Sequence, residues 1–176
     1  MTFRIVGSRL KADLDFLVAE TLDVEGPDGE LHQRLVVRHP GAAAVVLAES
    51  DEVVLVRQYR SAVDRHLLEI PAGKLDPGED PEAAAIREAA EETGFRPTVM
   101  QHLASIHTGP GFTDEVIHLY LGTELEEAVA QPDGPEEQDA EILRVPLSEV
   151  TDLIDQGAIT DSKTIAGLLL AKEVLA

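Results

Sequence analysis

Hydrophobic and polar residues alternate along the first 39 positions and do not follow the 3.6-residue period of a helix. This alternation predicts three strands, at residues 3–6, 14–18 and 31–39, with a Gly-Pro-Asp-Gly turn at residues 26–29 before the last of them. Three strands alone cannot cover both of their faces, so we expect this segment to pack on a partner. The Pro-Gly pair at residues 40–41 separates it from the rest, which gives an N-terminal β region at 1–39 and a main domain at 40–176.

The main domain mixes strands with helices. The apolar run 42–48 is typical of a central strand that is buried on both faces, and a turn at 49–52 leads into a strand at 53–60. The clearest helix is predicted at 81–93, because Asp80 suits its N-cap, Pro81 its first turn and Gly94 its end. The remaining pattern predicts strands at 99–107, 115–122 and 143–145, an acidic surface loop at 124–141, and helices at 148–156 and 162–175. This order of elements predicts an α+β fold in layers.

Charge and composition narrow the classes of function. The chain has 34 Asp and Glu against 14 Lys and Arg, a formal net charge of −20, which repels phosphate backbones and argues against a nucleic-acid partner. An anionic substrate would therefore need a bridging cation. Cysteine is absent, which excludes disulfides and thiolate chemistry. No apolar run approaches about 18 residues, so we expect no membrane segment and a cytoplasmic protein.

The candidate chemistry lies on the predicted helix 81–93. Glu88 and Glu92 are four residues apart and share a helix face, with Glu91 beside them. At an effective dielectric of about 20 and a separation of roughly 5 Å, each like-charged pair costs about 3 kcal/mol before screening. A divalent cation such as Mg²⁺ would remove this conflict, and Arg87 can neutralise Glu91. For Glu88 and Glu92 taken alone, a solvated acidic face is an equally good interpretation.

The full pattern Gly73-x5-Glu79-x7-Arg87-Glu88-x2-Glu91-Glu92-x-Gly94 resembles the signature of the Nudix hydrolases. This resemblance implies an α/β/α sandwich, here with an N-terminal antiparallel β extension, and Mg²⁺- or Mn²⁺-dependent hydrolysis of nucleoside diphosphates linked to another group. It also implies metal ligands and their supports. Glu88 and Glu92 would be the principal ligands, Glu91 and the carbonyl of Ala72 contributors, Glu79 an accessory acid, Gly73 a site of close backbone approach, and Arg87 the residue that holds the glutamates.

Three features outside the signature are similar to the ADP-ribose pyrophosphatase subgroup: Pro110, fifteen residues after Phe95; the segment 57–60 followed by the segment 68–73; and the strand-rich N-terminal region 1–39. They imply cleavage of ADP-ribose to AMP and ribose 5-phosphate by a homodimer that exchanges residues 1–39 between its subunits. The substrate-binding residues implied by this resemblance are Arg60, Arg57, Glu69 and Gly111. For the arginines, ordinary surface ion pairing is an equally simple interpretation.

Hydrolysis also needs either a base for the attacking water or a water activated by metal. The subgroup resemblance places the catalytic glutamate in the acidic segment, at Glu137, with Glu136 as the substitute. Two other functions remain open. The same chemistry could act on another nucleoside diphosphate sugar such as GDP-mannose, or the chain could be a non-catalytic nucleotide sensor; a purely structural dimer module is a more distant alternative.

Overall fold

The computed structural model describes residues 2–175, which form two compact units. The first unit contains the described residues up to Gly41 together with the loop His107–Val116, and the second contains Ala42–Ile106 and the chain from Ile117 onward. The predicted N-terminal region therefore folds with a loop that lies about seventy residues later in the chain. Among the described residues, no helix combines the length and the apolar character needed to cross a membrane.

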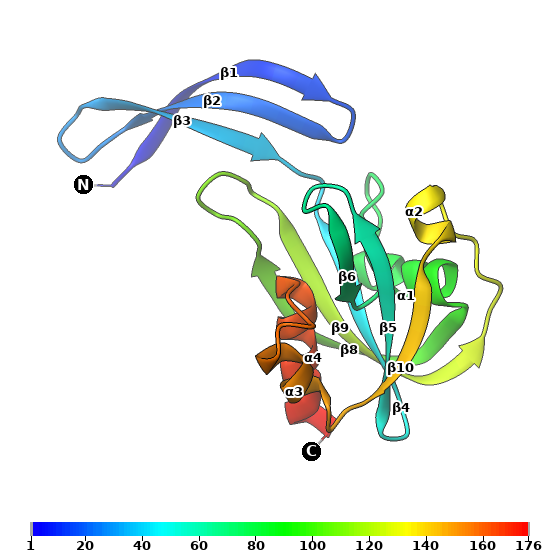
Figure 1. Ribbon diagram of the computed structural model, residues 1–176. Helices are drawn as coiled ribbons and strands as arrows, with labels where there is room; N and C mark the ends of the chain where they lie inside the picture. The colour runs from blue at the N-terminus through cyan, green and yellow to red at the C-terminus, as the bar shows by residue number, and fades with distance from the viewer. Residues whose placement is uncertain (1, 176) are drawn as a thin grey trace. The chain divides into compact units, whose positions relative to one another are not determined.

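The first unit is a three-stranded antiparallel sheet in the order β1 (Arg4–Leu14), β2 (Leu17–Glu25), β3 (Leu31–Arg38) (Figure 1). The predicted turn at 26–29 is confirmed, because it joins β2 to β3. The predicted strand at 14–18 is wrong: Leu14 ends β1, Leu17 begins β2, and Asp15 has a φ of 60° in the turn between them. Aspartate tolerates this left-handed conformation better than most residues.

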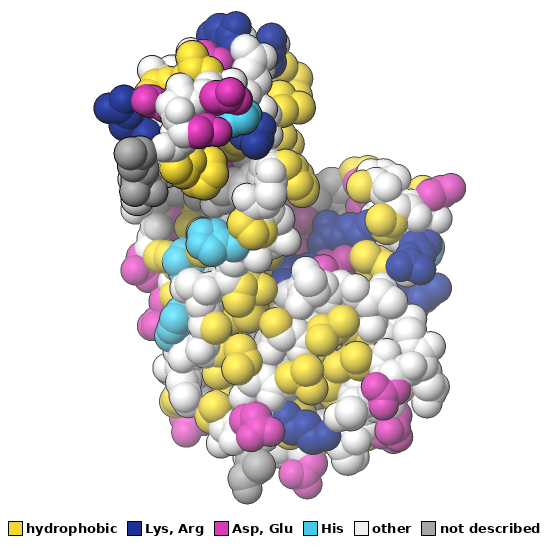
Figure 2. All heavy atoms as spheres, turned by 90° about the vertical axis from the view of Figure 1, so that its left-hand side faces the viewer, with side chains coloured by type: hydrophobic (Ala, Val, Ile, Leu, Met, Phe, Trp, Pro, Cys, Tyr) yellow, Lys and Arg dark blue, Asp and Glu magenta, His cyan; other side chains and the backbone are white. Residues whose placement is uncertain are grey.

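The loop 107–116 is tied to the end of β3. The Val37 N–H donates to the carbonyl of Phe112 at 2.7 Å, while Asp114 accepts from the Arg38 guanidinium and from the His39 N–H, both at 3.0 Å. The sheet leaves many hydrophobic side chains exposed among charged ones (Figure 2). The most exposed of these are Phe3, Ile5, Leu10, Leu14, Leu31 and Leu35.

The second unit is built on one mixed sheet, whose main path runs β10-β5-β4-β9-β8. Its strand β4 pairs in parallel with β9 and antiparallel with β5. The strands are β4 (Ala42–Glu49), β5 (Glu52–Arg60), β6 (Arg65–Glu69), β7 (Ala72–Lys74), β8 (Phe95–His107), β9 (Val116–Glu127) and β10 (Glu141–Pro146).

Helices cover both faces of this sheet, which makes the predicted three-layer sandwich (Figure 1). On one face lies α1 (Pro81–Thr93); on the other lie α3 (Val150–Asp155) and α4 (Ser162–Leu175). The strand β4 serves both layers, because Ala43, Val45 and Leu47 pack toward α1 while the alternating residues pack toward α3 and α4. The prediction of a central strand buried on both faces is thus confirmed.

The strands β4 and β5 pair over only three residue pairs, 47–54, 48–53 and 49–52, and then diverge. The short strands β6 and β7, which the sequence did not predict, fill the gap between them. The end of β5 pairs with β6, and the start of β4 pairs with β7. Residues 69–73 therefore run between two diverging strands, and the carbonyl of Pro71 accepts the N–H of Val45 at 3.0 Å.

The acidic segment 124–141 is not a single loop as predicted. The strand β9 continues to Glu127, and residues Pro135–Gln138 form the short helix α2. The last strand, β10, spans Glu141–Pro146 and not only 143–145, because its residues pair one by one with β5. The prediction failed here since an edge strand with charged residues lacks a clear hydrophobic signal.

Candidate active site

The helix α1 is fixed at both ends by residues that the sequence already identified. The Asp80 carboxylate accepts the N–H groups of Glu82 and Ala83 at 3.0 and 3.1 Å, and Gly94 ends the helix with a φ of 73°. Its small residues Ala84, Ala85 and Ala89 are fully buried against the sheet. Close packing on that side fixes the helix, and its glutamates lie toward the segment 69–73.

Glu88 and Glu92 both contact the strand β7. The Glu92 carboxylate accepts the N–H of Ala72 at 3.1 Å. A Cβ on Gly73 would lie 1.9 Å from Glu88 Oε1, so only glycine leaves room for this carboxylate. Of the metal ligands predicted from the sequence, Glu88, Glu91 and Glu92 lie on one helix, and Ala72 lies beside Glu92.

Arg87 ties the surrounding carboxylates together. Its Nε and Nη2 donate to the two oxygens of Glu79 at 2.9 and 3.0 Å, and its Nη1 donates to Glu88 at 2.7 Å and to Glu91 at 3.0 Å. The hydrogen bond with Glu79 is the main cause that raises the pKa of Arg87 and lowers that of Glu79. The arginine stays fully charged and fixes three carboxylates around itself.

The remaining negative charge at this site is poorly compensated. Burial, together with the charges of Glu88 and Glu137, raises the pKa of Glu92 to about 8. Burial also raises the pKa of Glu88, although Arg87 opposes the shift. Partly buried carboxylates that lie close together are a costly arrangement in a fold, and they offer the oxygen ligands that hard divalent cations prefer. The donor set present here therefore fits Mg²⁺ or Mn²⁺.

A buried ionic network lies at the end of β5. The Arg60 guanidinium makes a two-pronged contact with Glu69, with both distances at 2.8 Å, and Glu69 is only 2% exposed. Glu69 also accepts from the ammonium group of Lys163, which donates to Asp161 at 3.0 Å. The sequence did not identify Lys163 as a site residue. A lysine at the start of an apolar helix is a weak signal, and its partner Glu69 is 94 residues away.

Two of the predicted substrate-binding residues lie apart from this network. Arg57 is three positions before Arg60 on β5, an odd separation that places the two on opposite faces of the strand. Its guanidinium donates to Glu141 of β10 at 3.1 Å. Gly111 is exposed in the loop of the first unit.

The acidic segment meets the end of β5 at a pocket of about 210 Å³, whose lining includes Arg60, Glu136 and Glu137. Glu137 is half-buried, and its carboxylate accepts the N–H of Asp133 at 2.6 Å. Its charge contributes to the raised pKa values of Glu88 and Glu92. Glu136 is exposed, and its charge acts on Tyr59. Of the two candidates, Glu137 is therefore the one whose charge acts on the helix glutamates.

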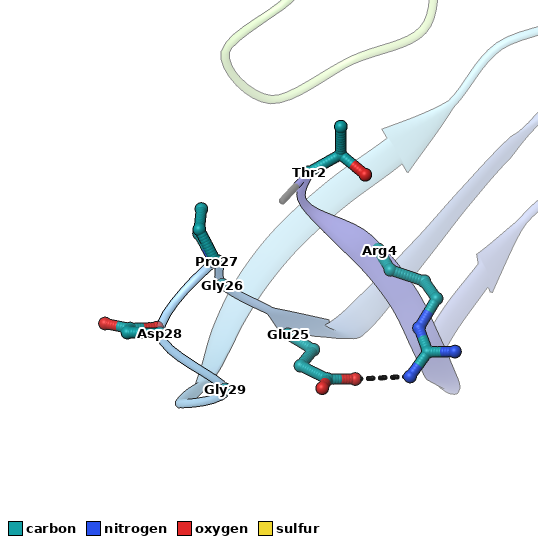
Figure 3. Close-up of a pocket in the computed structure, with 7 residues that line it drawn as sticks. All are labelled: Thr2, Arg4, Glu25, Gly26, Pro27, Asp28 and Gly29. Atoms are coloured by element: carbon teal, nitrogen blue, oxygen red, sulfur yellow. Dashed lines mark hydrogen bonds and ion pairs between the residues drawn. The ribbon is translucent and has the colours of Figure 1, made fainter.

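A second pocket lies at the hairpin end of the first unit, around an ion pair of 2.6 Å between Arg4 and Glu25 (Figure 3). Nearby, Asp28, Glu30 and His32 offer oxygen and nitrogen atoms within 4.8 Å of one another. The Asp28 carboxylate, however, already accepts the Glu30 N–H at 3.1 Å and closes the turn. Exposed acidic groups at a turn are common without a metal, so this cluster supports no metal site.

In this layered sandwich, the glutamate-rich helix α1 lies against the strand β7, which contains Gly73. The family model of the NUDIX domain matches residues 37–168, and the chain belongs to the Nudix hydrolase family. The family resemblance and the sandwich fold expected from the sequence are both confirmed.

Several known proteins are similar to the chain over most of its length. It is 42% identical over 144 residues to the methanol dehydrogenase activator of Bacillus methanolicus, covering 81% of this chain and 78% of that protein. It is 39% identical over 157 residues to the ADP-ribose pyrophosphatase of Bacillus subtilis, covering 87% and 84%. It is 38% identical over 157 residues to the GDP-mannose pyrophosphatase of Cronobacter sakazakii, covering 82% and 81%.

A solved structure supports the fold. The crystal structure of an ADP compounds hydrolase superposes with a TM-score of 0.86 at 24% identity, covering 99% of this chain and 95% of that one. At this level of identity the likeness bears on the fold alone.

Proposed function

We propose that the protein hydrolyses the pyrophosphate bond of ADP-ribose to AMP and ribose 5-phosphate with Mg²⁺ as cofactor, for which Mn²⁺ can substitute. The observation that carries this proposal is the packing of Glu88 and Glu92 against Ala72 and Gly73, which crowds carboxylates without compensating them fully. The relatives named ADP-ribose pyrophosphatase support the choice of substrate.

The metal ligands in this proposal are Glu88, Glu92, Glu91 and the carbonyl of Ala72. When bound there, the cation offsets the charge of the diphosphate and makes its phosphorus more electrophilic. Arg87 keeps the carboxylates in place, because its donors already contact Glu88 and Glu91. A protein with a net charge of −20 repels a diphosphate, and a bound cation would reduce this repulsion.

The chain supplies the remaining groups itself. Glu137 would accept the proton of the attacking water, and its partly buried position near the helix glutamates supports this role. Arg60 commits Nε and Nη2 to Glu69, and among the described residues its Nη1 has no hydrogen-bond partner. This Nη1 is therefore available to a phosphate oxygen of the substrate. Arg57 and Gly111 stay predicted substrate contacts that rest on the family resemblance alone.

A substrate panel tests the proposal. We expect release of phosphate from ADP-ribose, after coupling to a phosphatase, to exceed release from GDP-mannose and to require Mg²⁺ or Mn²⁺. Equal or faster turnover of GDP-mannose would show that GDP-mannose, and not ADP-ribose, is the preferred substrate. The similarity to a GDP-mannose pyrophosphatase is the reason for including this alternative. Binding of ADP-ribose without any metal-stimulated cleavage would instead indicate a sensor.

The variant Glu92→Gln tests the metal site. We expect a loss of more than about a hundredfold in rate, near 3 kcal/mol of transition-state stabilisation. We also expect Mn²⁺ to raise the melting temperature of the parent and not that of the variant, because only the parent binds the ion. The matched control is Glu49→Gln. It removes an exposed carboxylate at the end of β4, which pairs with Arg144 of β10 at 3.0 Å. An unchanged rate or an unchanged metal response in Glu92→Gln would contradict the assignment.

We further propose that the protein is a homodimer in which residues 1–39 contact the second subunit. The support is the exposed hydrophobic surface of the three-stranded sheet, where Phe3, Leu10, Leu31 and Leu35 are each more than 60% exposed. Side chains of this kind are costly to leave in water when they gather on one small sheet.

A further inference from the structure

Glu69 is almost completely enclosed by protein. Its carboxylate receives both prongs of Arg60 at 2.8 Å and the ammonium group of Lys163, and its side chain is only 3% exposed. The side chain of Arg60 is 40% exposed. Glu69 therefore contacts the buried side of the network, while Arg60 reaches toward solvent. This geometry differs from the direct substrate contact that the sequence resemblance implied for Glu69.

The partners of Glu69 are themselves fixed by the start of α4. Asp161 accepts from the Lys163 ammonium group at 3.0 Å, and from the N–H and hydroxyl of Thr164 at 2.9 and 2.6 Å. The Thr164 hydroxyl oxygen in turn accepts the N–H of Ile70 at 3.0 Å. The first turn of α4 thus holds residue 69 by its side chain and residue 70 by its backbone.

The same short segment continues directly to the predicted metal site. Two residues after Ile70, the N–H of Ala72 donates to Glu92, and the next residue, Gly73, contacts Glu88. Residues 69–73 therefore connect the arginine at the end of β5 with the glutamates of α1. A displacement of Glu69 would change the position of Arg60 relative to these glutamates.

We propose that Glu69 is a positioning residue, which holds the guanidinium of Arg60 toward the diphosphate of the substrate and is itself held by Lys163 of α4, whose ammonium group also donates to Asp161. This inference rests on the proposed function, because it takes Arg60 as a ligand of the substrate. A free arginine side chain has several rotatable bonds and loses entropy when a ligand fixes it. The contact with Glu69 restricts these bonds before the substrate arrives.

The charges of the network support a positioning role. Two cations, Arg60 and Lys163, face two anions, Glu69 and Asp161, so the buried group is balanced. Burial alone would raise the pKa of Glu69, but Arg60 and Lys163 outweigh it and hold the pKa at about 2. Glu69 is therefore ionised throughout the pH range of catalysis and does not serve as a proton donor.

The test is a double-mutant cycle on the full-length protein. We expect Glu69→Gln to raise the KM for ADP-ribose about tenfold and to change kcat by less than about threefold, because it disturbs a binding group and not the chemistry. Arg60→Ala should raise KM at least as much. In the Arg60→Ala background, Glu69→Gln should add less than about a twofold change, since there is no guanidinium left to position.

Each outcome of the cycle has one meaning. Effects on KM that multiply in the double variant would show that Glu69 acts independently of Arg60 and would overturn the inference, as would an unchanged KM in Glu69→Gln. A parent protein that does not cleave ADP-ribose would overturn the proposed function instead. The control Glu49→Gln, which also breaks an arginine–carboxylate pair, should leave KM and kcat unchanged.

A second variant covers the case in which Glu69→Gln does not fold, since it leaves the buried Lys163 and the partly exposed Arg60 with Asp161 as the one anion of the network. The combined change Glu69→Gln with Lys163→Met removes one charge of each sign and restores the balance. Folding is checked by the urea midpoint of each chain. The combined variant should show the same raised KM and the same insensitivity in the Arg60→Ala background; a KM equal to that of the parent would contradict the positioning role.

Discussion

At the scale of single residues, the position of the Glu88 carboxylate depends on a glycine, Gly73, which has no side chain to displace it. Glu88 lies so close to Gly73 that a Cβ there would be 1.9 Å from Oε1 and 2.0 Å from Cδ. Real Cβ atoms do not approach other atoms this closely, and the nearest group is a functional carboxylate already held by Arg87 at 2.7 Å. Any side chain at position 73 would therefore push Glu88 out of its place.

We predict that Gly73→Ala lowers the rate of ADP-ribose hydrolysis by about a hundredfold or more and weakens the response of the melting temperature to Mn²⁺. The reason is displacement of a metal ligand by roughly an ångström, which is costly for a site of fixed geometry. The control is Gly7→Ala in β1, where the new Cβ would be 3.4 Å from its nearest neighbour, an ordinary contact. A Gly73→Ala enzyme with the activity of the Gly7→Ala enzyme would refute the steric argument.

Residues whose roles depend on local spacing could be predicted from the sequence, and residues that meet across the chain could not. Glu88, Glu92 and Arg87 stand within one stretch of helix, so their spacing alone brought them together. Glu69 and Lys163 are 94 positions apart, and nothing in the local sequence of either indicates the other. The resemblance implied that Glu69 contacts the substrate, and we propose from its burial and its contacts that it positions Arg60.

At the scale of secondary structure, the same contrast holds for whole elements. The helix α1 and the strand β4 were predicted with nearly correct bounds, because Asp80 and Gly94 cap the one and a continuous apolar run marks the other. The strands β6 and β7 are five and three residues long and were missed. Their existence follows from the divergence of β4 and β5, which is a tertiary feature and leaves no periodic signal.

The network between β6 and α4 predicts a specific pH dependence of stability. The folded-state pKa of Glu69 is about 2, below its ordinary value of 4.5. A lowered pKa stabilises the fold above the unfolded-state value, and this stabilisation is lost as the pH falls from about 4.5 toward 2. The contribution is of order 3 kcal/mol at neutral pH.

We therefore expect Glu69→Gln to have a lower free energy of unfolding than the parent at pH 7. This difference in free energy, the gap between the two chains, should become smaller as the pH falls from 5 toward 3. Urea denaturation of both chains across this range measures the gap, and taking the difference removes the contribution of the many other carboxylates. The comparison chain is Glu49→Gln, whose exposed ion pair is worth less than about 1 kcal/mol at any pH. A gap for Glu69→Gln that does not change with pH would show that Glu69 is not held ionised by its partners.

At the scale of the whole molecule, the two units differ in how they bury their apolar side chains. The second unit buries its apolar residues in two core clusters on either side of one sheet. The first unit has one buried leucine, Leu22, and leaves most of the larger apolar side chains of its sheet exposed. The sequence indicated that three strands would need a partner, but not that a loop at 107–116 would join them. That loop is fixed by contacts with residues 37–39, far away in sequence.

The exposed apolar residues of the first unit predict that the protein forms a dimer. We expect the parent to sediment at twice its chain mass, because burial of side chains such as Leu10 and Leu35 offsets the cost of association at about 25 cal/mol per Å² of apolar surface. Leu10 lies on β1 and Leu35 on β3, which is an edge strand of the sheet, and their positions in the pairing register place them on opposite faces.

We therefore test Leu10→Lys and Leu35→Lys separately, since lysine is tolerated on exposed strands but not at an apolar interface. At least one of them should shift the protein to monomers at micromolar concentration while circular dichroism stays unchanged. The control Val129→Lys alters a side chain of the second unit that is even more exposed, at 78%, and this variant should remain dimeric. A monomeric parent, or two lysine variants that both dimerise as the parent does, would show that this sheet does not form the subunit interface. In that case its exposed leucines would need another partner.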